Sequence, residues 1–239
     1  MINGWINLDK PVGMSSAAAV AKVKWLLYQL PRAETDEKRK IKIGHAGTLD
    51  PLASGILPLA LGKATKTVQY MMDAQKAYEF SVTWGQERET DDAEGQVVVS
   101  SDARPTIAEI QEILHKFTGD IMQTPPNYSA IKLGGKRAYA LARAGQAVEI
   151  KSRQVSVVSL EIVGGDTNVT DFLCHCGKGT YIRSLARDMG RELGCYGYIS
   201  ALRRVMVGNF NEANAVTLPA LESMVSAGKL DFLQPVEEI

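Results

Sequence analysis

Apolar and polar residues follow two different periods along this chain. Apolar residues at every second position predict strands over six segments: 4–10, 78–84, 96–100, 155–163, 171–176 and 198–207. Apolar residues three or four positions apart predict helices after Ser16, after Thr106 and over 182–193, and a short last helix begins at Thr217. Strands and helices mixed in this way, with hairpins and no repeating strand–helix–strand unit, indicate an α+β fold with a mixed, largely antiparallel central sheet flanked by helices and loops.

The residues at the helix ends agree with this pattern. Ser15 and Ser16 are natural N-caps, and Pro31 ends the helix that follows them. Thr106 and Glu109 form a capping-box pattern at the start of the next helix. Its predicted buried stripe is Ile107, Ile110, Leu114 and Phe117.

Two segments interrupt the periodicity. The segment 32–42 is highly charged, which predicts a solvated loop with a basic end suited to phosphate contact. The segment 125–153 carries two prolines, two adjacent glycines, Tyr128 and Tyr139, together with the basic residues Lys132, Lys136, Arg137, Arg143, Lys151 and Arg153. An excursion of this length is uncommon in a compact domain unless it is functional or disordered. A hairpin or helix that covers the sheet and turns a charged face to solvent is the alternative.

Composition limits the function classes. With 239 residues, 45% hydrophobic and 23% charged, the chain suits one soluble domain over 1–239. The net charge is 0, so nucleic-acid binding would depend on a local basic cluster. No apolar run reaches the roughly 18 residues that predict a membrane span. The chain starts without the features of a secretory signal, and its three cysteines suit a reducing cytoplasm.

The segment Gly44–Pro51 reads G-H-A-G-T-L-D-P and holds the strongest candidate for chemistry. It places Asp50 in a turn rich in glycine and proline, with His45 five residues upstream. An acid in so constrained a loop is a candidate catalytic group. Asp-Pro is also a common turn pair, so a purely structural acid is the alternative.

Further polar residues stand out beside Asp50. Tyr78 begins a predicted strand, and Tyr181 and Arg183 lie at a glycine-rich junction between a strand and a helix. An arginine close to an acid favours its ionised form, and an ionised aspartate is a competent nucleophile. An ordinary structural or surface ion pair is the alternative for Arg183.

Two other motifs resemble a zinc site and a phosphate-binding loop, but their spacing excludes both interpretations. Cys174-His175-Cys176 lacks the second ligand cluster that tetrahedral zinc needs, and its alternation fits a strand, so we expect no metal site. Gly55 and Gly62-Lys63 do not form a P-loop, because six residues separate the glycines and Ala64 follows the lysine.

Several motifs together resemble the TruB family of pseudouridine synthases in order and spacing, from about Asn3 to Leu221. They are Leu8-Asp9-Lys10-Pro11-x-Gly13-Met14-Ser15-Ser16, Gly44-His45-x-Gly47-Thr48-Leu49-Asp50-Pro51, Tyr128-Ser129-Ala130-x-Lys132, Lys178-Gly179-Thr180-Tyr181-Ile182-Arg183 and Leu202-Arg203-Arg204. The resemblance implies the pseudouridine synthase fold and the isomerisation of uridine 55 in the T-loop of tRNA. It implies no cofactor, and we expect a cytoplasmic monomer.

The resemblance also implies residue roles. Asp50 would be the catalytic aspartate, Tyr78 would stack on the base and serve as a general base, and Arg183 would pair with Asp50. Tyr181 and Leu202 would line the pocket. His45 would occupy the space left by the flipped uridine, since the target base must leave its stack to be reached. Lys10 and Lys132 would be substrate or structural contacts, and Asp92 would lie near the active site.

The chain differs from the family pattern in two places. Ala33–Lys40 lengthens the segment before Gly44, and we expect the C-terminal PUA domain to be absent or truncated. Two other functions remain open. One is an RNA-binding or tRNA-folding chaperone without catalysis, and the other is a guide-RNA-dependent synthase that acts on ribosomal RNA.

Overall fold

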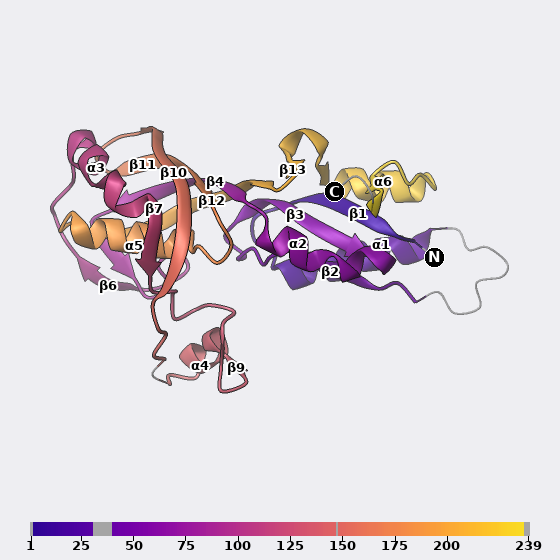
Figure 1. Ribbon diagram of the computed structural model, residues 1–239, viewed down its shortest axis with the longest axis horizontal. Helices are drawn as coiled ribbons and strands as arrows, with labels where there is room; N and C mark the ends of the chain where they lie inside the picture. Colours follow the sequence, from indigo (N-terminus) through magenta and orange to yellow (C-terminus); the bar gives the residue numbers. More distant parts are fainter. Residues whose placement is uncertain (1, 31–39, 147, 237–239) are drawn as a thin grey trace. The chain divides into compact units, whose positions relative to one another are not determined.

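The computed structural model describes residues 2–30, 40–146 and 148–236 (Figure 1). The chain divides into two compact units, which are residues 1–77 with 203–239 and residues 78–202. We call them unit 1 and unit 2. The chain passes between them within two strands, β4 (Lys76–Trp84) and β12 (Gly197–Val207). Residues 33–39 of the segment Ala33–Lys40, and most of the charged loop 32–42, lie outside the described residues.

Unit 1 is built on strand β1 (Gly4–Lys10), which pairs antiparallel with β3 (Ser54–Leu61) along its whole length. On its other edge β1 pairs in parallel with β14 (Val216–Thr217) and antiparallel with β15 (Leu233–Gln234). Strand β2 (Ile43–His45) pairs with β3, and β13 (Phe210–Asn211) pairs with the end of β12. This arrangement places Lys10 opposite Gly55, next to the segment that carries Asp50.

The helices of unit 1 are α1 (Ser16–Gln29), α2 (Val68–Asp73) and α6 (Leu218–Ser226). The Ser15 hydroxyl accepts a hydrogen bond from the Ala18 amide at 3.1 Å, so the predicted N-cap is confirmed. Helix α6 has Thr217 as its N-cap, as the sequence predicts. One-turn 3-10 segments cover Gly62–Lys66 and Glu212–Asn214.

Unit 2 contains a sheet with the strand order β12-β4-β11-β10-β7. Strand β10 (Arg153–Gly165) lies antiparallel between β11 (Val169–Cys176) and β7 (Gly119–Gln123). Helix α5 (Ile182–Glu192) approaches the sheet closely at Gly190, where a Cβ would lie 2.2 Å from the Gly197 nitrogen. Only glycine fits at that contact.

The structure differs from the sequence prediction around α3 (Ile107–Ile113), which continues as a 3-10 turn over Leu114–Phe117. The capping box of Thr106 and Glu109 is confirmed, and Ile110 and Leu114 are buried. Ile107 is 39% exposed, so its assignment to the buried stripe was wrong. Ile107 is the first residue of α3, so no preceding helical turn covers its side chain.

Strand β6 (Val97–Ser100) also pairs in an unexpected way. It forms a separate two-stranded sheet with β5 (Gln86–Arg88), which lies outside the six segments predicted as strands. The Glu87 and Arg88 side chains gave no apolar alternation, so no strand was expected there.

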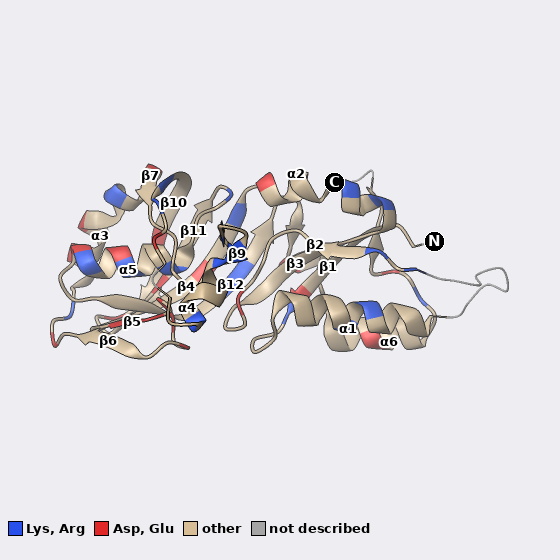
Figure 2. Ribbon diagram, turned by 90° about the horizontal axis from the view of Figure 1, so that it is seen from below, with Lys and Arg blue, Asp and Glu red and all other residues tan. Residues whose placement is uncertain are grey.

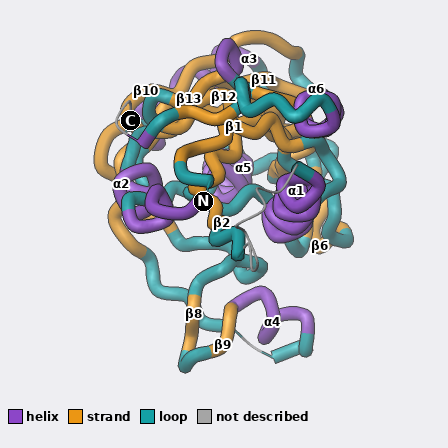
Figure 3. The backbone as a smooth tube through the Cα atoms, turned by 90° about the vertical axis from the view of Figure 1, so that its right-hand side faces the viewer, coloured by secondary structure: helices purple, strands orange, loops and turns teal. Residues whose placement is uncertain are grey.

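The segment 125–153 forms a small module of its own, with the hairpin β8 (Lys132–Leu133) and β9 (Lys136–Arg137) followed by α4 (Ala138–Arg143) (Figure 3). Its hairpin is separate from the large sheet. Five basic residues of the module are exposed: Lys132, Lys136, Arg137, Arg143 and Lys151. Figure 2 shows basic residues gathered around β9 and α4. The guanidinium groups of Arg137 and Arg143 both lie 5.9 Å from the centre of the Tyr139 ring.

The observed architecture therefore confirms the α+β class and the mixed, largely antiparallel sheet. Among the described residues, no helix is both long enough and apolar enough to cross a bilayer.

Candidate active site

The backbone around Asp50 is tied to the first residue of α1 and to the turn before it. The buried Ser16 hydroxyl accepts a hydrogen bond from the Leu49 amide at 2.8 Å and donates one to the Leu49 carbonyl at 2.9 Å. On the other side of Asp50, the Gly13 amide donates to the Pro51 carbonyl at 2.8 Å. Both residues that flank the acid are thus fixed from the same segment. We call residues 47–56, which carry Asp50, the Asp50 turn.

Lys10 reinforces this attachment from inside unit 1. Its side chain is fully buried, and its ammonium donates to the carbonyls of Pro11 at 2.9 Å, Met14 at 2.7 Å and Ala53. A buried ammonium needs such partners because desolvation is costly. These contacts give Lys10 a structural role in the Asp50 turn, and contact with a substrate stays a prediction.

Arg204 on β12 closes the Asp50 turn at both ends. Arg204 is 1% exposed, and its guanidinium donates to the Ile56 carbonyl at 2.8 Å and to the Gly47 carbonyl at 3.0 Å. Gly55 has φ +100°, and a Cβ there would lie 2.2 Å from the Arg204 carbonyl oxygen. The glycine is therefore required for the close pairing of β3 with β12.

Within this frame Asp50 is half-buried and Thr48 is exposed. His45 ends β2 and pairs with Leu59 of β3. Sequence reasoning singled out Asp50 and His45, but it interpreted Ser16 only as a helix cap. Its proximity to Leu49 depends on a contact between residues 33 positions apart, which no local pattern reveals.

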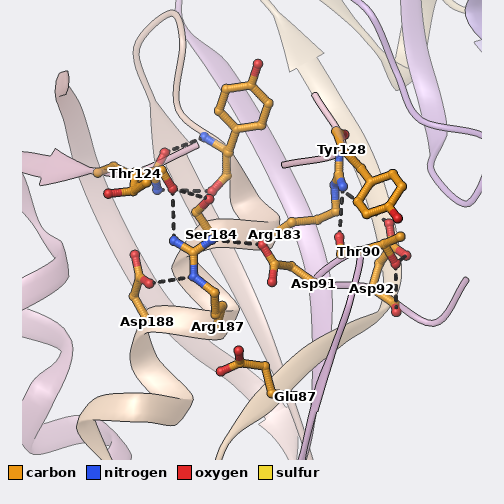
Figure 4. A network of polar contacts seen from close by, with 12 residues as sticks. Glu87, Thr90, Asp91, Asp92, Thr124, Tyr128, Arg183, Ser184, Arg187 and Asp188 are labelled. Carbon is orange, nitrogen blue, oxygen red and sulfur yellow. Dashed lines mark hydrogen bonds and ion pairs between the residues drawn. The ribbon is translucent and has the colours of Figure 1, made fainter. Parts of the chain in front are cut away.

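Arg183 occupies the first turn of α5 in unit 2 and is 5% exposed. It donates to the carbonyl of Thr90 at 2.8 Å and to that of Tyr128 at 3.0 Å, and its Nε lies 3.7 Å from an Asp92 carboxylate oxygen (Figure 4). The predicted location of Asp92 beside the candidate site is consistent with this contact. Because Asp50 belongs to unit 1, its pairing with Arg183 stays a prediction.

Tyr181 directly precedes α5 and is held through its main chain. The buried Gln123 side chain accepts from the Tyr181 amide at 2.8 Å and donates to the Tyr181 carbonyl at 3.1 Å. The Arg153 guanidinium lies 5.2 Å from the centre of the Tyr181 ring and donates to the Gly179 carbonyl at 2.7 Å. The ends of the 125–153 module are thus attached to the same glycine-rich junction that carries Tyr181 and Arg183.

The other predicted site residues lie on three further strands, of which β4 and β12 are neighbours in the sheet. Tyr78 is buried on β4, Leu202 is buried on β12, and Lys132 is exposed on β8 of the module. The structure brings Arg183, Tyr181 and Asp92 into one region. Their roles toward a base or an RNA stay predictions.

Sequence reasoning missed a row of arginines on α5. Arg183, Arg187 and Arg191 recur every four residues, so they lie on one side of the helix. Arg187 donates to an Asp91 carboxylate oxygen at 2.9 Å, and Arg191 binds both Glu87 oxygens, at 2.8 and 2.6 Å. We call these three residues the α5 arginine row. The four-residue spacing, together with the acidic segment Glu87–Asp92, was a signal that could have revealed it.

Burial raises the pKa of Asp91 to about 6, although the neighbouring Arg187 and Arg183 guanidinium groups lower it. The desolvation of this carboxylate therefore outweighs its ion pairs. Asp91 is also one of the few non-glycine residues with a positive φ among those the structure describes, at 60°. Such a conformation persists where surrounding contacts impose it.

Comparison with known proteins agrees with this geometry. Residues 33–182 match the N-terminal domain model of the TruB family pseudouridylate synthases, and residues 183–239 match the C-terminal domain model of tRNA pseudouridylate synthase B. The chain belongs to the TruB family.

Its relatives include the tRNA pseudouridine synthase B of Mesorhizobium japonicum, which is 56% identical over 93% of this chain and 65% of its own length. The protein of the same name from Rhizobium etli is 55% identical over 93% of this chain and 71% of its own length. The chain thus spans about two thirds of the length of these relatives.

Among solved structures, a chain of a Cbf5-Nop10-Gar1 complex matches with a TM-score of 0.73 and 31% identity, over 98% of this chain and 60% of that chain. A chain of an H/ACA RNP bound to a substrate RNA containing 2′-deoxyuridine matches with a TM-score of 0.70 and 28% identity, over 98% of this chain and 60% of that chain. These matches support the assignment to the pseudouridine synthase fold.

Proposed function

We propose that this protein isomerises uridine to pseudouridine in tRNA, at position 55 of the T-loop, with Asp50 as the catalytic carboxylate. Family membership and the names of the relatives at 55–57% identity support the reaction class and the tRNA substrate. The observation that carries the assignment of Asp50 is the Asp50 turn itself. Hydrogen bonds fix Leu49 and Pro51, the residues on either side of the acid, while the acid is only half-buried.

The reaction needs little from the protein beyond placement and one acid. The C1′–N1 bond of the nucleoside breaks, the base rotates, and C1′ bonds to C5 instead. The C5 hydrogen leaves and N1 gains a proton, so no redox partner or phosphate donor enters the balance. Asp50 could attack C1′, add to C6 of the base, or abstract the 2′ proton, and each route uses an ionised carboxylate.

The remaining roles follow the family pattern. Arg183 would hold Asp50 ionised, and Tyr78 would stack on the flipped base. Tyr181 and Leu202 would line the pocket, and His45 would fill the space that the base vacates. The exposed basic residues of the 125–153 module, Lys132 among them, would contact RNA phosphates and loop bases around Tyr139.

The test combines this chain with an unmodified T-arm stem-loop transcript and maps pseudouridine chemically. The wild-type protein should modify the T-loop uridine at position 55 without a guide RNA, and Asp50→Asn should make no product. We expect Asp50→Asn to bind the transcript within about tenfold of wild type, or about 1.4 kcal/mol, because the phosphate contacts lie elsewhere.

Three results would overturn parts of this proposal. RNA binding without any product would favour the chaperone function. Activity that appears only with a guide RNA and ribosomal RNA would favour a function like that of the H/ACA relatives. Full activity in Asp50→Asn would remove Asp50 from the chemistry.

A further inference from the structure

Two separate segments of unit 2 supply partners to Arg183. Thr90 and Asp92 belong to the loop after β5, and Tyr128 lies at the start of the 125–153 module. The position of the Arg183 guanidinium therefore depends on how firmly both segments are held.

Arg187 contacts the same two segments one helical turn further along α5. It donates to the Asp91 carboxylate at 2.9 Å, between Thr90 and Asp92, and to the Thr124 carbonyl at 2.9 Å, four residues before Tyr128 (Figure 4). Ser184 donates to the same Thr124 carbonyl at 2.9 Å. Arg187 is 8% exposed, so these contacts are shielded from water.

Because of the backbone conformation of Asp91, its contact with Arg187 also affects the orientation of Thr90 and Asp92. Its φ of 60° is costly for a non-glycine residue, and it sets the directions of the Thr90 carbonyl and the Asp92 side chain. The Ile199 amide donates to the Asp91 carbonyl at 3.1 Å, which fixes the main chain from the other side. The side chain of Asp91 is held by Arg187.

We propose that Arg187 is a positioning residue for Arg183, an inference that rests on the catalytic role proposed for Arg183. It acts by fixing the loop at Asp91 and the chain at Thr124, directly before the module, so that Arg183 stays in one orientation. Arg187 is not expected to touch the RNA.

The test compares Arg187→Met with Arg191→Met, which removes the same charge from the same helix one turn away. Arg191 is the better exposed of the two and pairs with Glu87. On the T-arm stem-loop, Arg187→Met should lower kcat roughly ten- to hundredfold, because a misplacement of about 1 Å has such effects. Its KM should change by less than about twofold. Arg191→Met should match wild type in both constants.

A second readout follows the Arg183 Nε–H by nitrogen-15 NMR, assigned by its loss in Arg183→Lys. In wild type and Arg191→Met this proton should exchange slowly with solvent. In Arg187→Met it should exchange at least about tenfold faster, because the site opens locally. Unchanged exchange in Arg187→Met would overturn the inference.

The double variant Arg187→Met/Asp91→Asn separates positioning from folding. It removes the unpaired buried carboxylate, so its thermal midpoint should recover toward that of wild type while kcat stays low. Recovery of kcat together with stability would show a merely structural role. If the wild-type protein makes no pseudouridine, the proposed function fails, and the exchange of the Arg183 Nε–H alone decides the positioning role.

Discussion

In the Asp50 turn, the groups that fix the backbone are a hydroxyl and two cations that donate to main-chain carbonyls. In the α5 arginine row, the cations instead meet carboxylates at Glu87, Asp91 and Asp92. Carbonyl groups do not titrate, whereas a buried carboxylate does. The contacts that hold the Asp50 turn should therefore be insensitive to pH. The ion pairs that hold Arg183 and its neighbours on α5 should weaken or strengthen with pH.

The largest expected effect is on the Asp50 turn. Gly55→Ala should lower the free energy of unfolding by at least about 3 kcal/mol, because it combines a strained φ with a backbone clash at the Arg204 carbonyl. Gly44→Ala on the neighbouring strand β2 is the matched control, since no atom lies within 4 Å of its added Cβ. Denaturant unfolding measures both, and equal losses would show that the clash is relieved by backbone movement.

The next largest effect concerns the buried carboxylate of Asp91 and the pH dependence of stability. Asp91 has a raised pKa of about 6 in the folded protein, so its contribution to stability is present below its ordinary pKa of 3.8 and is lost as the pH rises through 6. The stability of wild type relative to Asp91→Asn should therefore fall between pH 4 and pH 7, by at most about 3 kcal/mol.

Asp166→Asn is a control of opposite sign. Hydrogen bonds from the Val169 and Asn168 amides lower the pKa of Asp166, so its contribution is lost as the pH falls. Chemical unfolding at a series of pH values measures both differences. A flat curve for Asp91→Asn would mean that its ion pair with Arg187 cancels the cost of burial.

A smaller effect is expected from Ser16→Ala, which leaves the buried Leu49 amide and carbonyl without their side-chain partner. The loss should be about 2 kcal/mol and independent of pH between 5 and 8. Ser15→Ala removes a helix cap and should cost about 1 kcal/mol. Ser16→Ala should also lower kcat more than Ser15→Ala, because Leu49 adjoins Asp50. Equal effects on kcat would remove Ser16 from the support of the acid.

The smallest effect concerns the outer end of the α5 arginine row. Glu87→Gln weakens a pair in which the Arg191 side chain is 53% exposed, so it should cost less than about 1 kcal/mol. The difference should shrink further in about 1 M salt. Thermal unfolding at low and high salt checks this, and a loss comparable to that of Gly55→Ala would contradict the weak role of this pair.

The sequence predicted well those features that depend on local periodicity. The caps at Ser15 and Thr106 and the apolar face of α5 follow from spacing alone, and all three are present. The constrained turn at Asp50 was also evident from its glycines and prolines. Ile107 was misassigned because a helical stripe does not show where the first turn loses its cover.

The supports of the candidate site could not be found in the same way. Ser16 and Leu49 are 33 residues apart, and Arg187 and Asp91 are 96 residues apart. Arginine is usually a surface residue, so the sequence gives no sign that Arg204 is buried. Its guanidinium is buried because it donates to carbonyls of the Asp50 turn. Local patterns place the candidate residues, and the tertiary fold supplies the groups that hold them.

The ends of the 125–153 module meet in a closed neck. Gln123 faces Arg153 in the β7–β10 ladder, and the Thr124 and Ser152 hydroxyls lie 2.7 Å apart. With the neck closed by the sheet, a change in the length of the module alters only its own loop entropy, by about 0.6 kcal/mol for each doubling. Residues can therefore be added to or removed from the module during evolution without disturbing the β7–β10 ladder that closes the neck.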